Sequence, residues 1–353
     1  MRWNPLLLLA LGCAETTAPL PPPEELLLVG NAGTATLSYV SLRENGPRFL
    51  IQLGYDVRVD ARPFAGRKYA VISVARGDSL AVIDLLHRVV ARVVSVGDGA
   101  GALGGVVLND SIAYVALSER NVILKVNLET GDTLGIHVGS NPQDVVVARG
   151  KLFVVNANLT DCPPPDLRCP AGESWVSVVD PITNSPSLPD SIPLPGPGHA
   201  SYAAVGADGR VYVMQLGGPD APDGRLSIVD PLNRHEVGNF GGFGVSPGSI
   251  AADLGERVMV ASLTEGLMEF NTRTRTVVRG AGAGLPLTAN SGVAIDSQGR
   301  IYGIEAGCAV QPTGRARVFR PDLTEARPIP LGNCAGGATT TLIPVETLLE
   351  AQN

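Results

Sequence analysis

The sequence predicts an all-β fold, a ring of seven four-stranded antiparallel sheets, and three observations lead to it. First, 42 glycines and 28 prolines make up about a fifth of the 353 residues, and because both residues disrupt helix interiors, a protein of long helices is excluded. Second, a pattern of short apolar segments recurs along the chain at a near-constant interval. Third, a β-rich segment, residues 337–343, follows the last repeat and has nothing else to pair with.

Each repeat contains an apolar strand that ends in small or polar residues. Its seven copies are residues 27–31, 70–74, 113–117, 152–156, 211–215, 258–262 and 301–305. The next strand ends in an Asp or Asn, whose side chain can bond its own backbone two residues on and so begin a tight turn. These residues are Asp84, Asn127, Asp180, Asp230 and Asn271. Another apolar strand, such as 89–96, and an inner strand, such as 144–147, complete the repeat, and four short strands per repeat indicate a propeller blade.

The repeat count and the last segment together predict a closed ring. Residues 26–344 shared among seven repeats give about 46 residues per blade, near the spacing of propeller repeats. The first repeat lacks an inner strand, and residues 337–343 could supply it and cover both exposed sheet edges. We therefore expect a seven-bladed β-propeller over residues 26–344, closed by a C-terminal strand that completes blade one, with residues 345–353 as a tail.

The N-terminus predicts export and a lipid anchor. Residues 1–12 have the pattern of a lipoprotein-type signal peptide, with one Arg, a short apolar core and a Gly before Cys13. The core is too short to span a bilayer, which takes about 20 apolar residues. The segment LALGC resembles a bacterial lipobox, in which Cys13 is acylated; an ordinary cleaved signal and a misplaced start are the alternatives.

Residues 13–25 are polar and Pro-rich, which favours an extended tether. The expected location is the bacterial cell envelope, on the periplasmic or cell-surface side. The expected partner there is the lipid membrane, to which acylated Cys13 would anchor the protein.

The other four cysteines form an even set, as in the disulfide framework of an exported chain. Cys162 and Cys169 bracket a short Pro-rich segment that predicts a loop, so a loop-closing disulfide is expected, and Cys308 would then pair with Cys334. Zinc is the alternative, but the CxxC spacing is absent and no histidine lies near these cysteines in the sequence. No metal site is assigned.

Several segments resemble a known repeat. Residues 139–158 joined to 174–184, and 206–215 joined to 225–233, are similar to the YVTN-type β-propeller repeat of exported bacterial proteins. The resemblance covers roughly residues 55–331 and implies the propeller fold. Its superfamily includes surface and periplasmic binding proteins, lactonases and a lyase, so it implies no single activity.

His199 is the histidine expected on the axial face, because the other three lie in outer turns or on an outer strand. It is either a general base or ligand contact, or a solvated loop residue. Carboxylates and amides expected on the same face are Glu119, Gln143, Asn156, Asn158, Gln215, Glu265, Asn290 and Glu305. Such a ring of oxygens could bind a divalent cation; a hydrated channel is the alternative, and no cofactor is predicted.

Two matches to catalytic patterns are set aside. Residues 99–104 fit GxGxxG but precede a predicted strand, whereas a dinucleotide site needs a helix there. Residues 244–248 fit GxSxG but lead into a predicted inner strand, whereas a nucleophile elbow needs a strand, turn and helix.

The formal charge of −7 argues against nucleic acid as a partner. We expect a monomeric binding or interaction module for an unknown protein, peptide or small-molecule ligand. The alternative is a propeller hydrolase or lyase resembling the lactonases, with a metal or with His199 beside Glu265 or Glu305. The binding module is favoured, because no nucleophile and base converge in the sequence.

Overall fold

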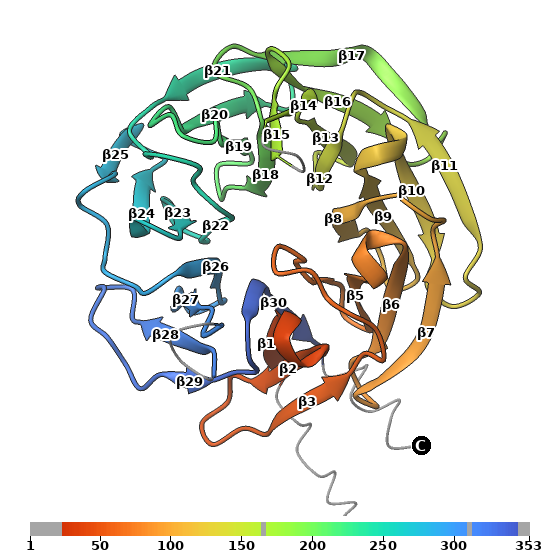
Figure 1. Cartoon of the computed structure of the whole chain (residues 1–353), viewed down its shortest axis with the longest axis vertical. Helices are drawn as coiled ribbons and strands as arrows, with labels where there is room; N and C mark the ends of the chain where they lie inside the picture. Colours follow the sequence, from red (N-terminus) through yellow and green to blue (C-terminus); the bar gives the residue numbers. More distant parts are fainter. Residues whose placement is uncertain (1–22, 164–166, 309–312, 345–353) are drawn as a thin grey trace, which may run out of the picture.

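The computed structural model describes residues 23–163, 167–308 and 313–344, which form a seven-bladed β-propeller around a central channel (Figure 1). Each blade is a four-stranded antiparallel sheet, so the predicted fold is confirmed. The predicted signal peptide, Cys13, most of the predicted tether and the predicted tail lie outside the described residues.

Each blade orders its four strands from the channel outward. Blades one to three contain β30 (Ala335–Ile343), β1 (Glu24–Asn31), β2 (Thr36–Ser41) and β3 (Arg48–Gln52); β4 (Phe64–Ala65), β5 (Tyr69–Val74), β6 (Ser79–Asp84) and β7 (Val89–Ser95); β8 (Ala102–Val107), β9 (Ile112–Leu117), β10 (Val122–Asn127) and β11 (Thr133–His137). Blades four and five contain β12 (Pro142–Ala148), β13 (Lys151–Asn156), β16 (Ser174–Asp180) and β17 (Ser185–Leu194); β18 (Ala200–Val205), β19 (Val211–Gln215), β20 (Arg225–Asp230) and β21 (His235–Phe240). Blades six and seven contain β22 (Ile250–Ala252), β23 (Arg257–Ser262), β24 (Gly266–Asn271) and β25 (Thr276–Arg279); β26 (Asn290–Ile295), β27 (Ile301–Glu305), β28 (Arg315–Phe319) and β29 (Ile329–Pro330).

The described helices are three 3-10 turns. They are η1 (Ala32–Thr34), η2 (Ala75–Gly77) and η3 (Ser118–Arg120). Among the described residues, no helix has the length and apolar character that crossing a membrane requires.

The two middle strands of each blade are covered on both faces by neighbouring blades, which explains their nearly continuous apolar sequence. All six residues of β5 are buried, whereas β7 at the rim buries one of its seven. Apolar side chains form seven clusters, one between each pair of adjacent blades. The core is therefore a ring of inter-blade layers around the channel.

Strand β30 closes the ring as predicted. It pairs antiparallel with β1, with Thr339 opposite Leu28 and Ile343 opposite Glu24. Ala335 and Ala338 of β30 pack with Tyr302 and Ile304 of blade seven. The first and last strands of the chain therefore share one sheet, in which β30 covers the channel-side edge of β1.

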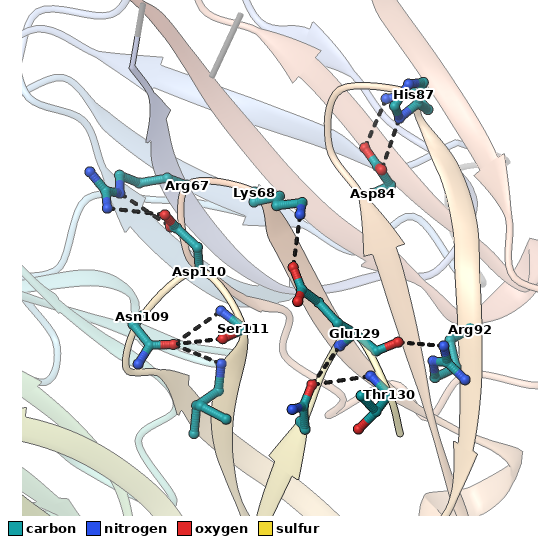
Figure 2. Close-up of polar contacts among 12 residues, drawn as sticks. Arg67, Lys68, Asp84, His87, Arg92, Asn109, Asp110, Ser111, Glu129 and Thr130 are labelled. Atoms are coloured by element: carbon teal, nitrogen blue, oxygen red, sulfur yellow. Dashed lines mark hydrogen bonds and ion pairs between the residues drawn. The ribbon is translucent and has the colours of Figure 1, made fainter. Parts of the chain in front are cut away.

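Asp and Asn residues form the predicted tight turns on one face of the ring (Figure 2). Asp84 Oδ1 accepts hydrogen bonds from the backbone N–H groups of Leu86 and His87, at 2.9 Å each. Asn127, Asp180, Asp230 and Asn271 bond the backbone two or three residues on in the same way.

Ion pairs link blades two and three on this turn face. Arg67 pairs with Asp110, with Nη2 and Oδ2 3.0 Å apart, and Lys68 Nζ lies 2.9 Å from Glu129 Oε1 (Figure 2). Arg67 and Lys68 lie just before β5, and Glu129 follows β10. Because the two ends of each strand lie on opposite faces of the ring, the β5–β6 and β9–β10 turns lie on the other face, the axial face.

Blade four carries an insertion of two short strands, β14 (Leu159–Cys162) and β15 (Leu167–Pro170). They pair antiparallel, so the segment around the cysteines is a hairpin, where the prolines had predicted a loop. Cys162 and Cys169 form a disulfide with Cα atoms 5.8 Å apart, and Cys308 and Cys334 form another with Cα atoms 4.4 Å apart. Both predicted pairings are confirmed, and they favour an oxidising location outside the cytoplasm.

Candidate functional site

A cavity opens on the axial face, where the connectors between blades one to five converge. Its volume is about 380 Å³, and we call it the axial recess. It is lined by Arg58, Asp60, Arg76, Glu119, Arg168 and His199, among others. A smaller cavity of about 140 Å³ shares Asp60 and His199 with it and is also lined by Arg62 and Tyr202.

Three arginines reach the axial recess from separate segments. Arg58 lies in the connector between β3 and β4, Arg76 in the β5–β6 turn, and Arg168 on the inserted strand β15. They bring three positive charges to a cavity whose lining contains two carboxylates, those of Asp60 and Glu119.

The three arginines differ in how fully they are paired. Arg58 donates to both carboxylate oxygens of Asp60, at 2.8 and 2.7 Å. Arg168 donates from its Nη atoms to Asp161 at 2.8 Å and to Glu119 at 3.4 Å, but its buried Nε has no partner. Within the part of the chain that the structure describes, the exposed Arg76 makes no hydrogen bond or ion pair. Donors therefore remain for an added anion.

A buried ion pair connects the smaller cavity to the channel. Arg62, which lines both, donates to Asp144, which lines the channel, and their side chains are 15% and 1% exposed. Asp144 also accepts the backbone N–H groups of Val145 and Ala203, at 2.9 Å each. Burial alone would lower the pKa of Arg62, but the carboxylate of Asp144 raises it, so the guanidinium stays charged.

Tyr202 covers this ion pair. The guanidinium of Arg62 lies 5.5 Å from the centre of the Tyr202 ring, a cation–π contact. Burial raises the pKa of Tyr202 to about 12, and the charge of Asp60 acts in the same direction. The phenol is therefore neutral at physiological pH.

Below this cluster, inner strands of all seven blades line a channel cavity of about 380 Å³, mostly with Val, Ala and Ile.

His199 lies in the connector before β18 with a left-handed backbone, φ 57°. Burial lowers the pKa of its imidazole; a hydrogen bond to the Gly217 backbone opposes the shift, and the charge of Arg168 adds to it. The imidazole is therefore neutral at pH 7. Of the histidines, His199 lines the recess, and the other three lie on outer strands or turns.

Glu119 and Gln143, expected on the axial face, line the axial recess. Gln143 donates to Ser118 Oγ at 3.0 Å and to the Asn141 carbonyl at 3.1 Å. Asn158, next to the inserted hairpin, donates to the Glu173 carbonyl at 3.0 Å.

The other expected amides lie inside the blades. Asn156 bonds Ser177 Oγ at 3.0 Å and Gln215 bonds Ser227 Oγ at 2.8 Å, each joining two neighbouring strands of its blade. Asn290 donates to the Gly266 carbonyl at 2.9 Å. Asn156, Gln215 and Asn290 are at most 1% exposed, so they contribute to the blades and do not line the axial recess.

Glu265 and Glu305 are also engaged elsewhere. Glu265 accepts the Gly282 N–H at 2.6 Å. Glu305 is 3% exposed and pairs with Arg315 and Arg317. Burial would raise the pKa of Glu305, but these arginines lower it. Among the described residues, no contact joins His199 to either carboxylate, and no group of three His, Cys, Asp or Glu side chains is placed to hold a metal ion.

The arginines of the axial recess are the residues that sequence reasoning missed. Arg58 and Arg76 lie in segments that the repeat pattern places on the axial face. The pattern could therefore have predicted their position, as it did for the acids, amides and His199. Arg168 gave no such signal, because its hairpin has no counterpart in the other repeats.

Comparison with known proteins supports the fold alone. No family model matches the chain, and no curated protein matches it. Among solved structures, the chain is similar to a chain of Kuenenia stuttgartiensis hydrazine synthase, with a TM-score of 0.61 and 14% identity. The match covers 80% of this chain and 89% of that one. The YVTN-type repeat therefore remains a resemblance.

Proposed function

We propose that this protein is a binding module whose axial recess binds a small molecule carrying carboxylate or phosphate groups. The observation that carries the proposal is the convergence of Arg58, Arg76 and Arg168 on one cavity with donors left over. Guanidinium groups bind carboxylates and phosphates through paired, charge-assisted hydrogen bonds. Three separate segments of the fold carry these side chains to the cavity.

The module acts as a monomer in the cell envelope, anchored through acylated Cys13. The lipobox-like segment supports this, as do the two disulfides. Strand β1 begins at Glu24 on the turn face and runs toward the axial face. A tether entering there holds the turn face toward the membrane and leaves the axial recess facing away from it.

A hydrolase or lyase is the second candidate, because a neutral His199 at the recess could act as a general base. It has less support, since Glu265 and Glu305 are bound to other groups. Turnover of a lactone by the wild type and its loss in His199→Asn would favour this candidate.

Isothermal titration calorimetry at low ionic strength, with citrate and inorganic phosphate as probes, tests the binding proposal. Arg76→Gln should weaken binding about tenfold or more, because a hydrogen bond to a charged group contributes roughly 1.5–3 kcal/mol. Arg149→Gln is the matched control, an exposed arginine in the β12–β13 turn on the opposite face, and should bind as the wild type does. No binding by the wild type, or equal binding by Arg76→Gln, would contradict the proposal.

A further inference from the structure

We propose that the Cys162–Cys169 disulfide clamps the β14–β15 hairpin as one wall of the axial recess, so that its reduction weakens ligand binding. This inference rests on the binding function proposed above. It adds a redox-sensitive element to that function, located in the one insertion that departs from the blade pattern in the described residues.

The hairpin supplies part of the axial recess directly. Leu159, Leu167 and Arg168 line the cavity. Arg168 precedes Cys169, so the disulfide fixes the backbone next to the guanidinium. From there Arg168 reaches Asp161 on the paired strand and Glu119 in the β9–β10 turn. The position of this arginine thus depends on the hairpin keeping its shape.

The hairpin has few other restraints. Its ladder runs over four residue pairs, from Leu159 opposite Pro170 to Cys162 opposite Leu167. At its base, the Leu159 N–H donates to Asn141 Oδ1 at 2.9 Å. An isolated two-stranded hairpin is marginally stable in water. The disulfide joins Cys162, in the last pair of the ladder, to Cys169, one pair from its base, and it decides whether the two strands stay paired.

The reduction itself is ordinary thiol–disulfide exchange. A thiolate of a dithiol reductant attacks one sulfur, the S–S bond breaks, and the second thiol of the reductant closes its own disulfide. The hairpin gains two electrons and two protons as two thiols, and the dithiol is oxidised. Both cysteines are half-buried, so a small dithiol has access.

The second disulfide provides the control. Cys308 and Cys334 lie before and after blade seven's outer strands, and neither lines the axial recess. The Cys308→Ser/Cys334→Ser variant leaves the hairpin clamp as the chain's remaining disulfide. Adding dithiothreitol to this variant therefore reduces the hairpin bond alone.

Calorimetry with citrate and trypsin cleavage after Arg168 test the proposal, with circular dichroism to verify folding. The Cys162→Ser/Cys169→Ser variant should bind citrate at least tenfold more weakly than the wild type and be cut after Arg168, where the oxidised protein is protected. The Cys308→Ser/Cys334→Ser variant should match the wild type until dithiothreitol is added. The Arg168→Gln variant keeps the Cys162–Cys169 disulfide and should also bind citrate more weakly. It therefore tests the role of the hairpin even if the cysteine variant misfolds.

The outcomes separate the two proposals. Citrate binding that is unchanged by reduction overturns the clamp but leaves the binding function standing. A wild type that binds neither citrate nor phosphate refutes the binding function and the clamp with it, whether or not trypsin cuts the reduced hairpin.

Discussion

Asp144 satisfies three donors at once, the guanidinium of Arg62 and two backbone N–H groups, at a point that water hardly reaches. The arrangement ties the connector before blade two to the inner strands of blades four and five. Removing one partner would leave a buried charge without compensation, which is more costly than losing a surface pair.

Asp144→Asn should therefore lower the free energy of unfolding by about 3–5 kcal/mol. Asp110→Asn is the matched control, since its pair with Arg67 is exposed on both sides, and should cost about 1 kcal/mol or less. Urea unfolding of the two variants measures both values. Equal small losses would show that the Arg62–Asp144 pair is not a structural tie.

His199 gives a pH dependence with a defined sign. Its folded-state pKa lies below its ordinary value, so the unfolded chain binds the proton more readily. Stability contributed by the neutral imidazole is complete above about pH 6.5 and is lost as the pH falls through that value toward the folded pKa. The melting temperature of the wild type should fall more between pH 7.5 and 5.5 than that of His199→Asn, in which Asn tolerates the left-handed backbone. Parallel pH profiles of the two proteins would argue against a half-buried neutral imidazole.

At the scale of elements, β30 has the greatest consequence, because one strand decides whether seven blades form a ring. Its loss would uncover the channel-side edge of β1, where Leu26 and Leu28 are fully buried. It would also remove Ala335 and Ala338 from the layer between blades seven and one.

A chain ending at residue 334 should therefore lose cooperative thermal unfolding and aggregate, because an uncovered apolar strand edge pairs with other chains. A chain ending at residue 344 keeps every described strand and serves as the comparison. Calorimetry and light scattering distinguish the two. A soluble, cooperatively melting 334-residue chain would contradict the closure by β30.

Local chemistry made much of this architecture predictable. Asp84 and Asn127 mark turns because their side chains bond nearby backbone, and a missing inner strand in the first repeat required a partner at the far end of the chain. The Arg62–Asp144 pair joins residues 82 positions apart, and nothing in either segment indicates the other. The repeat predicts that Asn156 ends a strand, but whether its side chain points into the recess or into its own blade depends on a serine of the next strand.

At the scale of the whole molecule, the polarity of the ring separates two tasks. The axial face carries the axial recess, and strand β1 begins at Glu24 on the turn face. If Cys13 is acylated, labelled palmitate should be incorporated by the wild type and not by Cys13→Ser, and the variant should move to the soluble fraction. Equal membrane association without label in both proteins would contradict the anchor.

In our proposal, an anion binds at the axial recess and not in the apolar channel beneath it. Hydrogen–deuterium exchange with and without saturating citrate tests this most directly. We expect slower exchange at Gly101, Glu119 and Arg168, which line the recess, and no change at the channel-lining strands of blades six and seven. Slower exchange confined to those channel strands, or none anywhere on the axial face, would contradict the account.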